Sequence, residues 1–114
     1  RSLLASTAMK YDFVVVTTTT GDPTVAERIA TDLVDRRLAA CVQIYGPVRS
    51  TYGWQGKVEY TEEHVVTLKT SVDKLAEVKQ AIVDLHPYDV PELIATPIVD
   101  GSTAYLEWLG EQLR

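Results

Sequence analysis

The sequence is poor in the residues that form disulfides and metal clusters. Its 114 residues include one cysteine, Cys41, and two histidines, His64 and His86. A disulfide within the chain is therefore excluded. A closed structural zinc site from one chain is unfavourable, because no pair has a ligand spacing such as CxxC or HExxH. A single cysteine fits a reducing compartment, and we expect the protein to be cytoplasmic.

Basic residues and long apolar runs are also scarce. Eleven Lys and Arg stand against sixteen Asp and Glu, which gives a formal net charge of -5. This balance argues against a duplex nucleic-acid binder, which needs a basic face for the phosphates. No apolar run approaches the roughly twenty residues that span a bilayer, and the scattered glycines form no Walker or dinucleotide fingerprint. We therefore expect neither nucleic acid nor a membrane as a partner.

The length of the chain favours one domain. A protein of 114 residues supports a single modest hydrophobic core. Residues 1–8 hold only a short apolar stretch and precede the first strand pattern, so we interpret them as an N-terminal extension or a cloning remnant. The single domain is expected at residues 9–114.

Strand and helix patterns alternate along this domain. Asp22, Ser71 and Ser102 are each placed to cap a helix, and Pro87 requires the second helix to stop before it. The expected elements are a strand at 11–18, a helix at 23–38, a hairpin at 38–70, a helix at 72–85, a strand at 93–99 and a short helix at 103–113. The last helix is expected to bury Tyr105, Leu106 and Leu109, with Trp108 as a further candidate.

The longest of these patterns is the hairpin at residues 38–70. β-branched and aromatic residues fill both arms, and Gly56 lies where a tight turn at residues 54–57 needs positive φ. Gly46 and Pro47 interrupt the first arm, so we expect a bulge, a bend or an edge there. A core of this size spans only about 20 Å, roughly six residues of strand, so the arms project beyond it. Because open ribbon edges invite another chain, the hairpin predicts an oligomer.

The order of elements is β-α-β-β-α-β followed by a helix. This order predicts an α+β sandwich of the ferredoxin-like type, with both main helices on one face of a four-stranded antiparallel sheet. The other face of the sheet would then be uncovered. Strands rich in Val, Ile and Tyr cannot leave a whole face in water without forming a large apolar patch, so we expect sister subunits to cover it.

Three side chains are candidates for chemistry. Cys41 is a candidate nucleophile, although its small aliphatic neighbours favour a buried structural cysteine. His86 follows the end of a helix and begins a proline-flanked connector. Its ring there either faces a metal or substrate or, when protonated, interacts favourably with the helix dipole. His64 follows two glutamates within a strand pattern, which favours a solvated residue. None of these spacings demands an enzyme.

Four charged residues share one side of the second hairpin arm, because side chains alternate between the two faces of a strand. Charged ladders commonly protect exposed strands, so a solvated or subunit-facing row of ion pairs is favoured over a binding site. The four residues are Lys57, Glu59, Glu63 and Lys69.

Five short motifs, in this order, resemble the CutA divalent-cation-tolerance family. The resemblance covers nearly the whole chain from about residue 11 onwards. It implies the ferredoxin-like fold, and it implies a tight homotrimer, similar to PII signalling proteins, that is held by strands exchanged between neighbours. The motifs are LAAC at 38–41, YGWQGK at 52–57, LKT at 68–70, HPYDVPE at 86–92 and YLEWL at 105–109.

The resemblance also implies a role in tolerance of copper and other divalent cations. In copper-binding bacterial members, the ligands are a cysteine at the end of the first strand and two adjacent histidines before Pro-Tyr. Here these positions are Thr18, Leu85 and His86, so His86 is the metal ligand that remains. The other matching positions, which a trimer would gather in a cleft near a subunit boundary, are Cys41, Trp54, Lys57, Glu59, Glu63, Lys69, Tyr88, Glu92 and Trp108.

These observations lead to three functional hypotheses. We expect a trimeric, non-enzymatic protein that binds or responds to divalent cations, with copper or another divalent cation as its one cofactor. The alternative is a PII-like signalling module that senses a small anionic metabolite at the intersubunit cleft. A third hypothesis is a hydrolase or transferase that uses Cys41 or His86.

Overall fold

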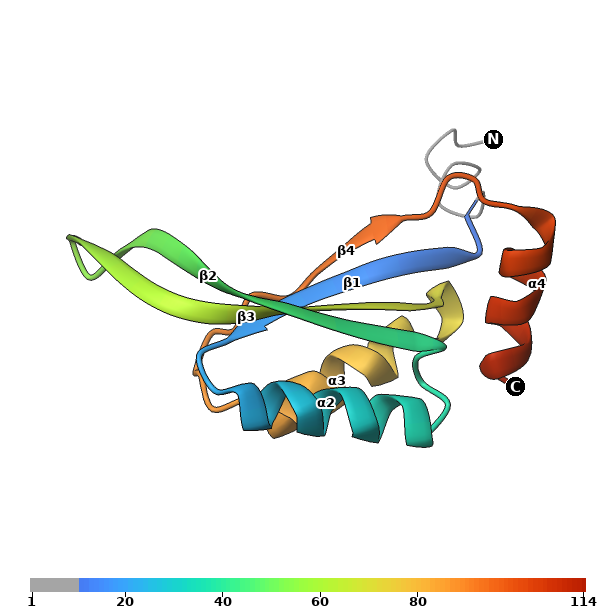
Figure 1. Ribbon diagram of the computed structural model, residues 1–114, viewed down its shortest axis with the longest axis horizontal. Helices are drawn as coiled ribbons and strands as arrows, with labels where there is room; N and C mark the ends of the chain where they lie inside the picture. The colour runs from blue at the N-terminus through green and yellow to red at the C-terminus, as the bar shows by residue number, and fades with distance from the viewer. Residues whose placement is uncertain (1–10) are drawn as a thin grey trace.

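A four-stranded antiparallel sheet covered by two helices forms the body of the molecule (Figure 1). The computed structural model describes residues 11–114, so the expected extension at 1–8 lies outside the described residues. The strands lie in the order β2-β3-β1-β4, which confirms the ferredoxin-like fold. The elements are β1 (Phe13–Thr20), α2 (Pro23–Asp35), β2 (Cys41–Trp54), β3 (Lys57–Ser71), η1 (Val72–Lys74), α3 (Leu75–Leu85), β4 (Ile94–Pro97) and α4 (Thr103–Gln112).

The core lies between the sheet and helices α2 and α3. Alternate side chains of β1 and β3 face the helices, so that Val16 lies opposite Leu68 and both are fully buried. Ile29 from α2 and Ile82 from α3 are also fully buried and belong to the same cluster. Burying one such side chain contributes about 1.5–3 kcal/mol, so this layer fixes β1 firmly against both helices.

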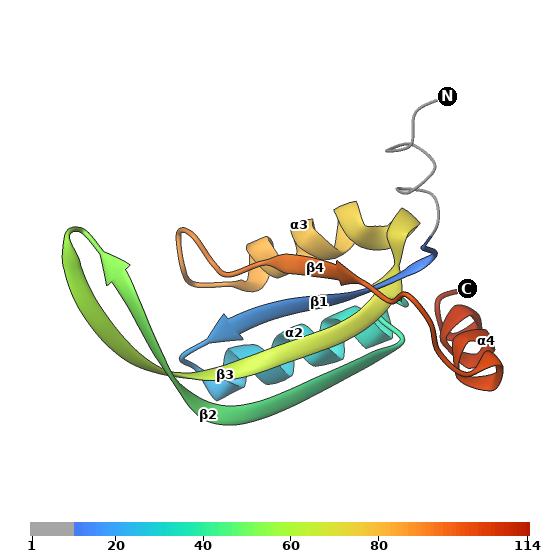
Figure 2. The ribbon, with the colours of Figure 1, turned by 90° about the horizontal axis from the view of Figure 1, so that it is seen from above.

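The long hairpin forms as expected. Gln55 and Gly56 have φ of 51° and 79°, as a two-residue type I′ turn requires. The register of β2 against β3 shifts between Tyr45 and Val48, which confirms the bulge. Gly46 is required there, because its φ is 136° and a Cβ would lie 3.0 Å from a backbone oxygen of β3. Beyond the bulge the ribbon of β2 and β3 projects past the helices (Figures 1 and 2).

Several expected boundaries are wrong. β1 continues to Thr20 instead of stopping at Thr18, because its last two residues still pair with β3. α2 ends at Asp35, three residues before the expected end, since Arg37 has φ of 57° and breaks the helix. The last strand is limited to residues 94–97.

Two of the three expected helix caps are confirmed. Asp22 accepts a hydrogen bond from the amide of the second residue of α2, and Ser102 accepts one from Tyr105. Ser71 does not cap an α-helix, because η1 intervenes and the Ser71 hydroxyl forms no cap hydrogen bond. The second helix therefore begins at Leu75.

Helix α4 stands at one end of the molecule, beyond the sheet (Figure 2). Leu109 and Leu113 are buried there with Ala40, and Phe13 packs against them. The expected burial of Tyr105 is wrong: it is 40% exposed, with its ring 5.5 Å from that of Trp108.

Lys74 fastens the end of α4 to the body of the protein. Its ammonium group donates hydrogen bonds to the carbonyl of Leu113 and, at 2.9 Å, to the carbonyl of Arg37. It therefore satisfies carbonyl groups beyond the C-terminal ends of two helices at once.

The face of the sheet opposite α2 and α3 is largely uncovered. Tyr45 and Ile94 lie on this face by their register and are 55% and 54% exposed. The expectation of an uncovered face is thus confirmed. Within residues 11–114, no helix combines the length and apolar character needed to cross a membrane.

Candidate functional site

Buried polar side chains gather at the end of β1. Such groups are more informative than buried apolar ones, because each costs free energy unless it is paired. They come from β1, from β3 beside it and from the residue that follows α3. The members are Thr18, Thr19, Thr20, Glu63 and His86.

His86 is held inside the protein by both of its ring nitrogens. Pro87 ends α3, and His86 takes the extended conformation expected before proline, with φ of -86° and ψ of 135°. The amide of Tyr88 donates to Nδ1 at 3.2 Å, so Nδ1 carries no proton. Nε2 therefore bears the proton and donates to the carbonyl of Thr19 at 2.6 Å.

Tyr88 joins three segments of the chain. Its hydroxyl donates to Oε2 of Glu63 at 3.0 Å and accepts from the amide of Gly21 at 3.0 Å. Its ring meets the His86 ring edge to face, with 4.6 Å between centroids. Burial, reinforced by the hydrogen bond to Glu63, raises the pKa of Tyr88 above its usual value. The connector after α3 is thereby tied to both the β1–α2 turn and the base of the ribbon.

Glu63 is a buried carboxylate at the bulge. Its residue is 7% exposed and lies opposite Val48, the first residue of β2 beyond the register shift. Within residues 11–114, no Lys, Arg or His nitrogen lies within ion-pair distance of Glu63. This burial within one chain differs from the solvated or subunit-facing row of ion pairs expected for Glu63. Its one recorded hydrogen bond comes from the Tyr88 hydroxyl to Oε2, so the other carboxylate oxygen is left without a partner among the described residues.

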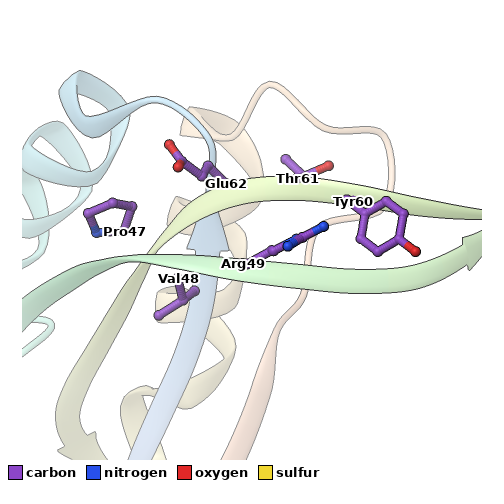
Figure 3. A pocket seen from close by; sticks show the side chains of 6 residues that line it. All are labelled: Pro47, Val48, Arg49, Tyr60, Thr61 and Glu62. Carbon is purple, nitrogen blue, oxygen red and sulfur yellow. The ribbon is translucent and has the colours of Figure 1, made fainter.

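A separate hollow of about 400 Å³ lies beside the bulge (Figure 3). Within it, the Arg49 guanidinium lies 4.7 Å from the centroid of the Tyr60 ring. A stacked guanidinium next to hydroxyl groups suits a small anionic group. The lining residues are Pro47, Val48, Arg49, Tyr60, Thr61 and Glu62.

The other predicted site residues are scattered within one chain. Cys41 lies opposite Lys69 and is half-buried, but the Lys69 ammonium donates to Oε1 of Gln43 at 3.0 Å. Trp54 and Lys57 form the last pair of the ribbon. The remaining three are exposed on the ribbon, the connector and α4: Glu59, Glu92 and Trp108.

The structure thus brings together Glu63, Tyr88 and His86, and it adds two groups that no sequence pattern indicated. These are the amide of Gly21 and the carbonyl of Thr19. They lie 67 residues from their partners along the chain, and main-chain groups carry no residue-type signal.

Comparison with known proteins places this chain in a family. The family described as "CutA1 divalent ion tolerance protein" matches residues 14–112. The chain belongs to the CutA1 divalent ion tolerance family. A CutA1 relative from Thermus thermophilus, named divalent-cation tolerance protein CutA, is 43% identical over 97 residues, covering 85% of this chain and 94% of the relative.

Solved CutA structures share the fold of this CutA1 family member. The crystal structure of CutA from Xylella fastidiosa superposes with a TM-score of 0.88 at 37% identity, covering 90% of this chain and 99% of the other. The structure named periplasmic divalent cation tolerance protein CutA from Archaeoglobus fulgidus gives a TM-score of 0.86 at 35% identity, covering 90% and 99%. The family names refer to ion tolerance and not to a catalysed reaction.

In this CutA1 protein, the positions expected to bind copper do not fit that metal as they are folded. Thr18 replaces the cysteine, and its fully buried hydroxyl has no hydrogen-bond partner among residues 11–114. Leu85 packs against the apolar core, and both nitrogens of His86 are engaged. No cluster of three or more His, Cys, Asp or Glu side chains suited to a metal occurs in the part of the chain that is described.

His64 also departs from the solvated residue expected for it. It is half-buried opposite Thr20, and its Nδ1 is buried without a hydrogen-bond partner among the described residues. Its ring is therefore a further polar group at the end of β1. Among the described residues, no contact between this ring and Glu63 is found.

Proposed function

We propose that this CutA1 family member is a non-enzymatic homotrimer that binds or responds to divalent cations at the cluster that contains Glu63 and His86. The observation that carries the proposal is the buried Glu63 carboxylate, which has no positive partner in the described chain. Carboxylate, carbonyl and imidazole groups are ligands for divalent cations. One chain supplies too few of them, so neighbouring subunits are proposed to supply the rest.

The trimer is supported by the surfaces that one chain leaves exposed. Tyr45 and Ile94 lie on the uncovered face of the sheet, and Tyr52, Trp54 and Tyr60 are exposed on the projecting ribbon. Large exposed apolar patches on a soluble protein commonly mark an interface with another protein chain. The lone cysteine fits a cytoplasmic location, which we propose for this chain.

A copper(II) titration with zinc(II) and cobalt(II) alongside tests the cation site. The variants are Glu63→Gln and His86→Ala, with His64→Ala as the matched histidine control. We expect stoichiometric binding by the native protein and by the control, and loss of that binding in Glu63→Gln and in His86→Ala. Copper binds many nitrogen and oxygen groups adventitiously, so equal weak binding by all four proteins would overturn the proposal. A monomer mass in light scattering would overturn the trimer.

A second function, PII-like sensing of a small anion, is favoured by one observation. The hollow beside the bulge holds the Arg49 guanidinium over Tyr60, which is suited to a carboxylate or phosphate group. Binding of inorganic phosphate or a nucleotide that disappears in Arg49→Met, with Arg28→Met as control, would support this function. Equal behaviour of the two variants would exclude the hollow as the sensor.

A further inference from the structure

The segment 86–92 crosses from the end of α3 to β4 and covers the end of β1; it is called the strap. One hydrogen bond from the His86 ring, Nε2 to the carbonyl of Thr19, and two at the Tyr88 hydroxyl attach it to the body, whereas the bond from the Tyr88 amide to Nδ1 of His86 lies within the strap. The strap contributes no helix or strand of its own. Its attachment therefore depends on the side chains of His86 and Tyr88.

The strap blocks the lone pair that a cation would need. A metal binds imidazole at an unprotonated nitrogen, which in His86 is Nδ1. That nitrogen already accepts the hydrogen bond from the Tyr88 amide, and Nε2 is directed at the Thr19 carbonyl. Coordination at Nδ1 therefore requires the Tyr88 amide to move away, and coordination at Nε2 requires the ring to leave Thr19.

We infer that the strap masks His86 and that the hydrogen bonds of the Tyr88 hydroxyl keep the strap closed. A cation then reaches His86 only when the strap opens. The masking follows from the contacts of this chain alone. The link to cations rests on the function proposed above.

The composition of the strap is consistent with opening. Val90 is 75% exposed, and both Pro87 and Asp89 are exposed. Between residues 87 and 92, the described chain has no backbone–backbone hydrogen bond to another segment. Segments with few such bonds and little burial open more readily than the rest of a fold.

A substitution at Gly21 tests the contact of the Tyr88 hydroxyl independently. A Cβ at this position would lie 3.2 Å from the Tyr88 hydroxyl oxygen and 3.5 Å from the Glu62 carbonyl. Gly21→Ala is therefore expected to displace the hydroxyl by a few tenths of an ångström and to weaken its hydrogen bonds, while leaving Tyr88 and Glu63 chemically intact. Tyr88→Phe removes the hydroxyl and keeps the ring. Both variants therefore weaken the contact between Gly21 and the Tyr88 hydroxyl, one through each partner.

The test of the masking uses the full chain without any metal. Nitrogen-15 NMR reports the tautomer of His86. Because the Gly21 amide loses its own acceptor in Tyr88→Phe, hydrogen exchange at the amide of Tyr88 is the measure of opening. We expect a ring protonated at Nε2, and exchange at the Tyr88 amide about tenfold faster in Tyr88→Phe, from the loss of one hydrogen bond, with a smaller increase in Gly21→Ala. Tyr105→Phe on α4 is the matched control and should leave exchange unchanged. A ring protonated at Nδ1, or exchange unaltered in both variants, overturns the masking.

The link to cations is then tested by titrating the same proteins with copper(II). If only the open strap binds, the apparent dissociation constant falls by the factor by which exchange rises. Faster exchange with an unchanged dissociation constant overturns the link and leaves the masking intact. Faster exchange with no stoichiometric binding in any protein overturns the proposed cation function instead.

Discussion

Two of the buried threonines provide a sharp test of the hydrogen bonding described above. Thr18 on β1 and Thr70 on β3 are both 0% exposed and lie on the face of the sheet that meets α2 and α3. The Thr70 hydroxyl donates to the Leu38 carbonyl at 2.6 Å, whereas the Thr18 hydroxyl has no partner among residues 11–114. Replacing each by valine exchanges a hydroxyl for a methyl group of similar size.

The two substitutions should change stability in opposite directions. Thr70→Val removes a hydrogen bond and leaves a buried carbonyl unsatisfied, which is expected to lower the free energy of unfolding by about 2 kcal/mol. Thr18→Val removes a buried hydroxyl that has nothing to bond, which is expected to raise it by about 1 kcal/mol. The two variants should therefore differ by about 3 kcal/mol.

Urea unfolding at one fixed protein concentration measures this difference, because the stability of an oligomer depends on concentration. Equal slopes against urea for the two variants would show that only stability has changed. The reasoning is refuted if Thr18→Val is destabilised as much as Thr70→Val. The Thr18 hydroxyl would then form a hydrogen bond that stabilises the protein as much as that of Thr70.

Three further predictions address other contacts. Lys74→Met should destabilise the protein by about 1 kcal/mol and speed amide exchange in α4, because two carbonyls lose a charged donor. Burial and the bond to Glu63 raise the pKa of Tyr88 in the folded state. The resulting stability is complete below the unfolded pKa of about 10 and is lost as the pH rises through the folded pKa, so alkaline unfolding curves of Tyr88→Phe should lack this loss. Gly56→Ala should cost about 1 kcal/mol in urea unfolding, because φ is 79° with no neighbour in the way.

Each of these has a matched control. Lys79→Met, on the exposed side of α3, should leave α4 exchange unaltered. Tyr105→Phe should retain the alkaline loss of stability. Gly53→Ala, in the same ribbon but without a positive φ, should be close to neutral. A control that behaves like its partner would contradict the contact assigned to that partner.

The elements that the sequence predicted well are those set by neighbouring residues. The turn at Gln55 and Gly56, the bulge at Gly46 and the Asp22 cap each depend on a residue type acting within a few positions. The same holds for the end of α3 before Pro87. A strand boundary was predicted wrongly where pairing between distant residues decides it, as at Thr20, which pairs with β3 and so remains in the strand.

The candidate site was less predictable, because its contacts join distant parts of the chain. Glu63 shares its parity with charged residues along the strand, and alternation therefore predicts a solvated side chain. The bulge and the Tyr88 hydroxyl, 25 residues away, bury it instead. His86 was identified as a candidate ligand from its position before Pro87, but its two hydrogen-bond partners depend on the tertiary fold.

The separation between the ribbon and α4 has a practical consequence for spectroscopy. The two tryptophans of the chain, Trp54 and Trp108, lie on the ribbon and on α4, which are at opposite ends of the molecule in Figure 1. Both are partly open to solvent, so the emission of each will respond to its own surroundings. Trp54→Phe leaves a reporter on α4, and Trp108→Phe leaves one on the ribbon. The protein thus carries two intrinsic fluorophores that can follow events at its two ends without an added dye.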